Sequence, residues 1–220
     1  MDRVTANWFD DKSVTVDRAP ELTDFMNDPN IVRIAGAPRA STVHVFSDEH
    51  AIAFKVDNAV FDEPMYLYLI QNSQSTCSFY LKIAVFVLKE KFTNAGIGPR
   101  CVIRTLMEAP AWARQQITIT HVEVSAIGDA TTFGLEKNPL RGYYVWATLG
   151  FDAPVPAATR AKLALPYRNC KNISELVMTE QGRDQWRMHG QSVDLSFDLR
   201  ANSASWLQLA RYMYSKGISP

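Results

Sequence analysis

The stretch TNAGIGPRC, from Thr93 to Cys101, decides how this sequence is expected to fold. It places Gly96 and Gly98 between a long apolar run and a segment with helical spacing. Glycine lets the backbone approach a ligand closely, and the first N–H groups of a helix lack partners, so the two together favour an anion. These residues alone leave two interpretations open: a plain strand-to-helix turn, or a cradle for phosphate.

The common phosphate-binding motifs do not match this stretch. A P-loop needs GxxxxGK(S/T), and a dinucleotide fingerprint needs a third glycine after an early parallel strand. Other parts of the sequence therefore have to decide between the two interpretations.

The residues before the glycine stretch predict strands. Short runs rich in β-branched and aromatic residues predict three neighbouring antiparallel strands, followed by two more, of which the last is long and central. In that last run Leu81, Ile83, Val85 and Val87 are expected on one face, and Tyr80, Ala84, Phe86 and Leu88 on the other. The runs are IVRIAG (31–36), STVHVFS (41–47), HAIAFKV (50–56), MYLYLIQ (65–71) and CSFYLKIAVFVLKE (77–90).

The residues after the glycine stretch predict a helix, a strand and a second helix. Apolar residues from Val102 to Met107 recur at helical spacing behind Pro99, and ITITHVEVSAIG (117–128) alternates like a strand. This order is typical of a right-handed crossover. Asn138 and Pro139 suit the start of a helix over 140–149, and Gly150 suits the position after its end.

The predicted fold is an α/β domain of the α+β type, with a mixed, mostly antiparallel central sheet flanked by helices. We expect a helical lead-in over residues 1–30, a core over 31–156 and a C-terminal extension over 157–220. In the extension, SVDLSFDLR predicts a strand and SWLQLARYMYSKG a final helix, which complete or cover the core.

Composition limits the functional classes. The 220 residues are 47% hydrophobic, which is enough for a sizeable core. Lys plus Arg and Asp plus Glu both total 23, so nothing favours a nucleic-acid or membrane-surface partner. Three scattered cysteines without a CxxC pair argue against disulfides and structural zinc, and the four histidines lack metal-binding spacing. Because the histidines lack that spacing, we expect no metal. The acidic N-terminus is unlike a signal peptide, so we also expect a cytoplasmic protein.

Several antiparallel strands, a long strand, GxG, a helix, a strand and then YYVWATLGF follow one another in this sequence. This order resembles the GCN5-related N-acetyltransferase (GNAT) superfamily, whose pyrophosphate loop reads (R/Q)xxGx(G/A). The likeness extends from Ile31 to Phe151. It implies an acyl-CoA N-acyltransferase-like fold, acetyl-CoA as co-substrate, and direct transfer of the acyl group to an amine of an unidentified acceptor.

The resemblance also implies a set of binding residues. Backbone N–H groups around Ala95 to Pro99, excluding proline itself, would hold the pyrophosphate, and pantetheine would lie like an extra strand against the end of the long strand. Arg100 and Arg104, one helical turn apart, are basic residues that could also meet a CoA phosphate, although such residues are common on helix surfaces. The implied contacts are Val87, Leu88, Lys89, Thr93, Asn94, Ala95, Gly96, Ile97, Gly98 and Arg100.

Two departures from the family pattern bear on catalysis. Thr93 stands where the family has Arg or Gln, and Trp146 stands where a tyrosine often protonates the departing thiolate. Tyr143 is the candidate replacement for that acid. Glu123, which shares a strand face with His121, is the candidate base, although both residues also fit a solvated sheet face.

Two other functions stay open. One is a catalytically silent module that binds CoA or a protein through the same site. The other is a small regulatory protein whose working surface is the segment 192–215. The sequence does not determine the acceptor or the oligomeric state.

Overall fold

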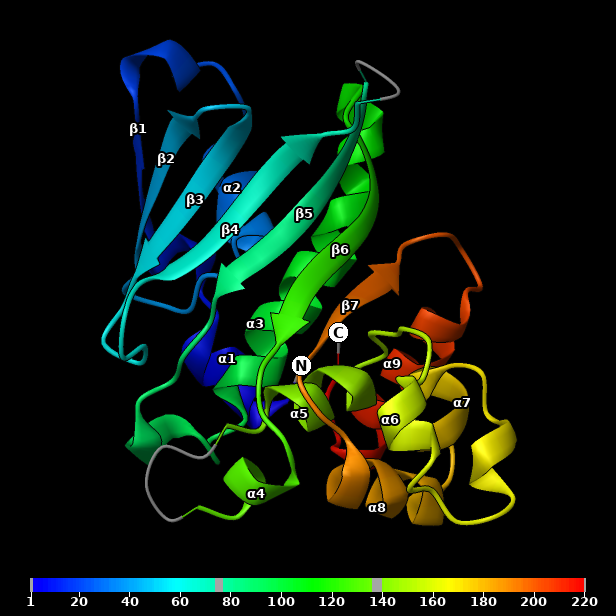
Figure 1. Cartoon of the computed structure of the whole chain (residues 1–220). Coiled ribbons are helices and arrows are strands. Elements are labelled where there is room, and N and C mark those ends of the chain that lie inside the picture. Colours follow the sequence, from blue (N-terminus) through cyan, green and yellow to red (C-terminus); the bar gives the residue numbers. More distant parts are fainter. Residues whose placement is uncertain (1, 74–76, 136–139, 220) are drawn as a thin grey trace. The chain divides into compact units, whose positions relative to one another are not determined.

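The computed structural model describes residues 2–73, 77–135 and 140–219 (Figure 1). The chain forms two compact units. The first unit consists of Met1–Val122 together with Gly217–Pro220, and the second consists of Glu123–Lys216. The domain boundaries expected after residues 30 and 156 stay a prediction.

The predicted mixed sheet flanked by helices is confirmed. In the described ranges, seven strands form one sheet in the order β1-β2-β3-β4-β5-β6-β7, and β6 runs from the first unit into the second. β1 pairs parallel with β2, whereas the β2–β3, β3–β4 and β4–β5 pairs are antiparallel. The strands are β1 (Thr15–Arg18), β2 (Thr42–Asp48), β3 (Ala51–Asp57), β4 (Met65–Gln71), β5 (Ser78–Val85), β6 (Thr118–Ala126) and β7 (Val193–Asp198).

The helices were predicted less completely. Those of the first unit are α1 (Arg3–Trp8), α2 (Asp28–Ile34) and α3 (Ile97–Glu108), with 3-10 turns at Asp11–Ser13, Pro20–Leu22, Glu90–Phe92 and Ala109–Gln115. Those of the second unit are α4 (Ala130–Phe133), α5 (Gly142–Thr148), α6 (Ala157–Arg160), α7 (Ile173–Val177), α8 (Glu180–His189) and α9 (Ala204–Ser215), with a 3-10 turn at Tyr167–Asn169.

The strand predicted over residues 31–36 is wrong, because residues 31–34 belong to helix α2 and Ala35 is its C-cap. The Asn27 side chain accepts a hydrogen bond from the N–H of Asn30, and Pro29 occupies the first turn of the helix. This capping outweighs the β-branched residues, whose side chains at Ile31 and Ile34 are fully buried on one helix face. The first strand of the sheet is instead β1, which the sequence analysis did not predict.

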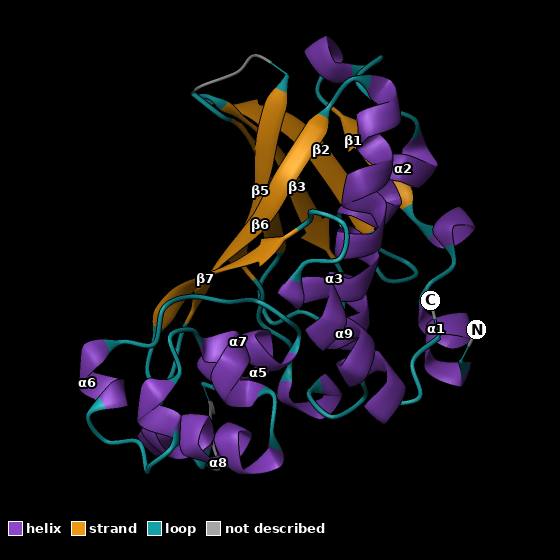
Figure 2. Ribbon diagram, turned by 90° about the vertical axis from the view of Figure 1, so that its right-hand side faces the viewer, coloured by secondary structure: helices purple, strands orange, loops and turns teal. Residues whose placement is uncertain are grey.

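The two faces of the sheet in the first unit differ. Leu81 and Ile83 of β5 point into the core, as predicted, together with Leu67, Leu69 and Phe54 of the neighbouring strands. The same prediction is wrong for Val85 and Val87, because a β-bulge pairs Val85 with Tyr66 on the opposite face, and Val87 lies beyond the end of β5 and is exposed. Helices α2 and α3 cover this face (Figure 2).

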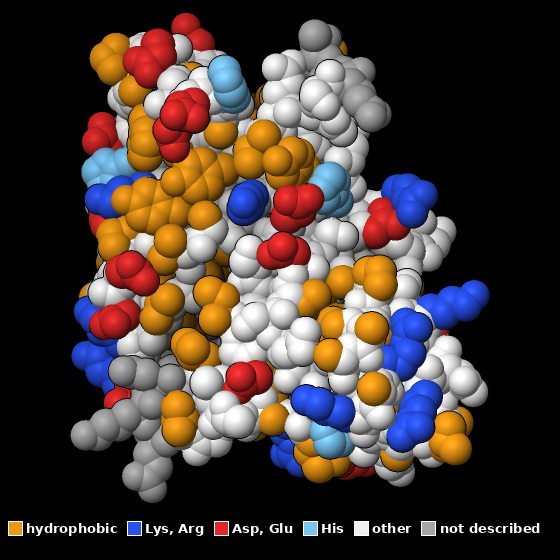
Figure 3. All heavy atoms as spheres, viewed as in Figure 1, with side chains coloured by type: hydrophobic (Ala, Val, Ile, Leu, Met, Phe, Trp, Pro, Cys, Tyr) orange, Lys and Arg blue, Asp and Glu red, His pale blue; other side chains and the backbone are white. Residues whose placement is uncertain are grey.

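The opposite face of these strands carries aromatic side chains. Cross-strand register puts Phe46, Tyr68 and Lys82 in one row, and the rings of Tyr66 and Tyr68 are stacked at 6.4 Å. Tyr80 is stacked on His121 of β6, with ring centroids 5.1 Å apart. Figure 3 shows hydrophobic side chains gathered over this face.

The crossover around the glycine stretch is present. β5 is followed by the 3-10 turn Glu90–Phe92, helix α3 and β6, and β5 and β6 point in the same direction (Figure 1). The helix expected behind Pro99 begins two residues earlier, at Ile97, and the chain tightens into a 3-10 helix at Pro110.

In the second unit, the helix expected over 140–149 is α5. Its expected start at Asn138 and Pro139 lies outside the described residues. Gly150 has a φ of +101° just past the end of α5, as expected for a glycine after a helix. The predicted final strand and helix are β7 and α9.

Candidate functional site at the start of helix α3

The backbone that follows β5 leaves one edge open. The N–H of Asp62 donates to the Val87 carbonyl, and the N–H of Lys89 donates to the Val60 carbonyl, both at 2.9 Å. Because alternate residues of an extended chain direct their N–H and C=O groups to opposite edges, those of Leu88 point the other way. Within the described part of the chain, neither group of Leu88 has a hydrogen-bond partner.

The start of α3 presents unpaired N–H groups. Gly96 is its N-cap, with a φ of +72°, and has no side chain that could cap the helix. The N–H groups of Gly96, Ile97 and Gly98 have no hydrogen bond to any described residue, and Pro99 has no N–H. Three adjacent donors at the positive end of the helix dipole suit a negatively charged group.

Gly98 brings these two features together. It is buried, and a Cβ placed on it would lie 2.9 Å from Cδ1 of Leu88 and 3.4 Å from the ring of Phe86. The absence of a side chain at Gly98 therefore allows the first turn of α3 to rest on the end of β5. As a result, the open edge of Leu88 and the free N–H groups belong to adjoining segments.

The loop before α3 is exposed and held by local hydrogen bonds. Thr93 Oγ1 donates to the Glu90 carbonyl at 2.8 Å, and the N–H of Ala95 donates to the Phe92 carbonyl at 3.1 Å. Thr93, Asn94 and Ala95 are all exposed. The hydroxyl of Thr93 thus closes the preceding turn, where the family pattern would place a longer side chain.

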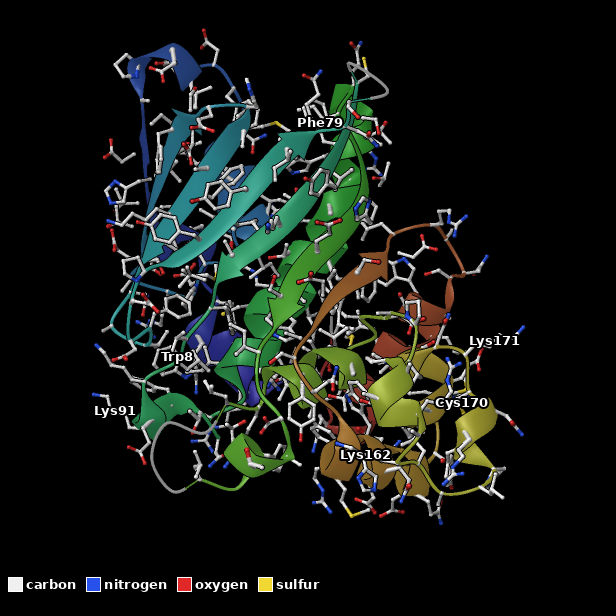
Figure 4. All side chains as sticks on the ribbon, viewed as in Figure 1. Trp8, Phe79, Lys91, Lys162, Cys170 and Lys171 are labelled. Carbon is white, nitrogen blue, oxygen red and sulfur yellow. The ribbon has the colours of Figure 1, made fainter. Side chains whose placement is uncertain are left out.

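An aromatic pair ties this loop to the N-terminal helix. Phe92 meets Trp8 of α1 edge-to-face with ring centroids 5.8 Å apart, and the Lys91 ammonium lies 5.0 Å from the Phe92 ring centroid. Trp8 and Lys91 are labelled in Figure 4. The contact holds the segment that leads into Gly96 against α1.

Arg100 lies within the protein and its guanidinium is engaged by other protein groups. It is 7% exposed, and it donates to Asp2 Oδ1 at 2.7 Å, Thr5 Oγ1 at 3.0 Å and the Gly96 carbonyl at 2.8 Å. Arg104 pairs with Asp11 and donates to the Ala37 carbonyl. Both arginines therefore join α3 to the N-terminal segment, and neither is placed as a free cation beside the loop.

Asp2 is the anionic partner of Arg100. Burial acts to raise the pKa of Asp2, but hydrogen bonds from the side chain and backbone of Thr5, and the hydrogen bond and charge of Arg100, hold that pKa well below its ordinary value of 3.8. The carboxylate consequently stays ionised in all but strongly acidic solution.

Cys101 does not behave as a nucleophile. It is 1% exposed, and burial raises its pKa to about 12 despite the nearby charge of Arg104. A thiol that stays protonated at neutral pH is unreactive, so Cys101 is a packing residue.

The two candidate catalytic residues belong to the second unit. Glu123 is half-buried on β6, one position before the buried Val124. Tyr143 of α5 is fully buried, its hydroxyl donates to the Arg187 carbonyl at 2.6 Å, and burial raises its pKa to about 12. These contacts give Tyr143 a packing role in the second unit.

Other polar groups of the second unit have structural partners. Ser125 Oγ donates to Asp194 on β7 at 2.7 Å. Asp129 caps α4 by accepting from the N–H groups of Thr131 and Thr132, and hydrogen bonds from the Thr131 side chain and the Thr132 backbone lower its pKa. Both residues therefore hold chain segments together.

The residues that the structure describes lack two further features. Among them, no group of three or more His, Cys, Asp or Glu side chains is arranged to hold a metal ion. No helix in the same part of the chain is both long and apolar enough to span a bilayer.

Local sequence patterns predict the glycine loop and the strand end but not the partners of Arg100. Asp2 and Thr5 lie more than ninety positions away, and a single Asp and Thr near the N-terminus carry no pattern that would connect them to α3. A resemblance restricted to residues 31–151 could not have included them.

Comparison of the chain with protein-family models, with curated proteins and with solved structures finds no match in any of the three.

Proposed function

We propose that this chain is an acyl-CoA-dependent N-acyltransferase of the GNAT type, which uses acetyl-CoA to acylate an amine. Two adjoining features carry the proposal: the N–H groups of Gly96, Ile97 and Gly98, and the open backbone edge of Leu88, none of which has a hydrogen-bond partner among the described residues. One feature suits a pyrophosphate, and the adjoining one suits the amides of pantetheine.

The binding mode follows from these groups. The pyrophosphate oxygens accept hydrogen bonds from the loop N–H groups, which need no basic side chain for this purpose. The pantetheine arm pairs with the N–H and C=O of Leu88 as an added strand would, between Val87 and Lys89, which already pair with the 60–62 segment. Asn94 and Ala95 form the exposed rim of the site.

The reaction is a direct acyl transfer. The neutral nitrogen of the acceptor amine attacks the thioester carbonyl, the C–S bond breaks and an amide forms. The amine loses one proton and the CoA thiolate gains one, so amine and thioester yield amide and thiol. We propose Glu123, directly or through a water molecule, as the group that accepts the amine proton.

A second candidate function is a silent module that binds CoA or a protein partner without catalysis. It is favoured by the absence of an evident acid, because Trp146 occupies the family's tyrosine position and Tyr143 is buried with its hydroxyl bonded to Arg187. Direct transfer does not strictly need a dedicated acid, because water can protonate the thiolate, so we retain the enzyme as the first proposal.

Binding is tested by calorimetry and thermal unfolding with acetyl-CoA and CoA. We expect a dissociation constant in the micromolar range, of about 1–100 μM. Gly96→Val should abolish binding, because its φ is positive and its Cβ would lie 2.7 Å from Nη1 of Arg100.

Gly134→Val is the matched control for that substitution. Gly134 has a φ of −93° and no atom of the described residues within 4 Å of its Cβ position, so the same change there should leave affinity unaltered. Wild-type protein that shows neither heat of binding nor stabilisation at millimolar acetyl-CoA would refute the proposal.

Catalysis is tested by thiol release and mass spectrometry across amines, peptides and aminoglycosides. Acylated product that falls at least tenfold with Glu123→Gln, at unchanged acetyl-CoA affinity, supports the enzyme and its base. Binding without transfer or hydrolysis supports the silent module instead.

A further inference from the structure

We propose that the Asp2–Arg100 ion pair is a latch that holds the glycine loop in its binding conformation, so that the N-terminal segment controls the site. This inference rests on the proposed acyl-CoA binding, and it assigns Arg100 a positioning role in place of contact with the cofactor. It starts from the side chains that meet around one guanidinium.

Arg100 links the first residues of the chain to the residue that starts α3. Its Nη1 donates to the Gly96 carbonyl, while its Nη2 and Nε donate to Asp2 and Thr5. The Gly96 carbonyl belongs to the residue with positive φ from which the free N–H groups begin. A guanidinium held by Asp2 and Thr5 therefore holds the peptide plane between Gly96 and Ile97, and this plane orients the N–H groups at the start of α3.

Asp2 joins three segments through one carboxylate. Its Oδ1 accepts from the N–H groups of Val4 and Thr5 as well as from Arg100, and its Oδ2 accepts from Thr5 Oγ1 at 2.7 Å. The N–H of Ser219, near the other end of the chain, lies 3.4 Å from Oδ2. Loss of this one charge should therefore loosen α1, the C-terminal residues and the loop together.

Burial makes the ion pair effective. The side chains of Arg100 and Asp2 are only 9% and 14% exposed. At this degree of burial, water cannot fully replace either charged partner. Removing one side chain therefore leaves the other charge poorly solvated and its side chain free to move. The contact of Phe92 with Trp8 adds a second attachment between the loop and α1.

The latch and direct cofactor contact predict opposite results for Asp2→Asn. Asparagine still accepts the N-cap hydrogen bonds of α1 but loses its charge. If Arg100 only positions the loop, acetyl-CoA affinity should fall by about 5- to 10-fold. If Arg100 contacts phosphate, release from Asp2 should leave the affinity unchanged or raise it, and this result would overturn the latch.

Thr5 offers a matched pair of variants. Thr5→Val has the same shape but removes the hydroxyl that bridges Arg100 and Asp2, whereas Thr5→Ser keeps it. We expect weaker acetyl-CoA binding for the valine variant and near wild-type binding for serine. Asp24→Asn is the charge control, because Asp24 is exposed and has no hydrogen bond or ion pair among the described residues.

Hydrogen exchange gives a readout that does not need the cofactor. In Asp2→Asn, a peptide covering residues 92–101 should exchange several-fold faster than in the wild type, while peptides of β2 and β3 stay unchanged. Unchanged exchange at 92–101 would refute the latch even if acetyl-CoA binds. Faster exchange there in a protein that binds no acetyl-CoA would support the latch and refute the proposed function.

Discussion

Gly98 of α3 lies directly against Leu88 at the end of β5, so closely that a Cβ on the glycine would come within 2.9 Å of Leu88 Cδ1. This single contact sets how near the helix start comes to the open strand edge. The N–H groups of Gly96, Ile97 and Gly98 adjoin the open edge of Leu88 because residue 98 carries only a hydrogen in place of a side chain.

Gly98→Ala should therefore destabilise the protein by about 1–3 kcal/mol through overpacking. Leu88→Ala alone should destabilise it through lost packing, but the two changes together should be less harmful than their sum, because the smaller residue 88 makes room for the new methyl group. Urea unfolding of the four proteins measures this coupling. Strict additivity would show that the two residues do not compete for the same space.

Cys77 and Cys101 should differ sharply in reactivity toward thiol reagents. Cys77 is exposed, whereas Cys101 is buried with a pKa raised to about 12. Ellman's reagent at pH 8 should label Cys77 first and reach Cys101 only after unfolding. A Cys77→Ser variant identifies the fast phase. Rapid labelling of Cys101 in the native protein would contradict the packing role given to it.

The stability contributed by Asp2 should depend on pH in strongly acidic solution. Its folded-state pKa lies below the ordinary 3.8, so its contribution is complete above that value and is lost as pH falls below it. The difference in unfolding free energy between the wild type and Asp2→Asn should be constant above about pH 5 and shrink below about pH 4. A difference that does not change between pH 6 and pH 2.5 would argue against an ionised, paired Asp2.

Tyr143→Phe should act on stability. The substitution removes the hydrogen bond to the Arg187 carbonyl from a buried ring, at a cost of about 1 kcal/mol or somewhat more. Denaturant unfolding checks the size of the effect. A lowered acyl-transfer rate with unaltered stability would instead restore Tyr143 as the acid that the family resemblance implies.

The sequence predicted those parts whose signals are local. Alternation in 41–47, 50–56, 65–71 and 117–128 is confirmed by β2, β3, β4 and β6, and Gly150 ends α5 as expected. The error at 31–36 was also local in origin, because the cap at Asn27 and Pro29 was passed over in favour of β-branched residues. The site residues in the loop and at Leu88 stay predictions until a ligand is tested.

The sequence by itself predicted β2, β3, β4, β6 and the glycine turn before α3, because hydrophobic periodicity and the conformations of tight turns depend on a few neighbouring residues. Only the tertiary structure shows which groups Arg100 contacts, and whether it also meets the cofactor stays a prediction. A basic residue at the start of a helix suits a phosphate as well as a carboxylate, and the choice depended on Asp2 and Thr5 folding back from the far end of the unit. The contacts of Tyr143 likewise come from tertiary packing, which buries its ring and places its hydroxyl 2.6 Å from the Arg187 carbonyl.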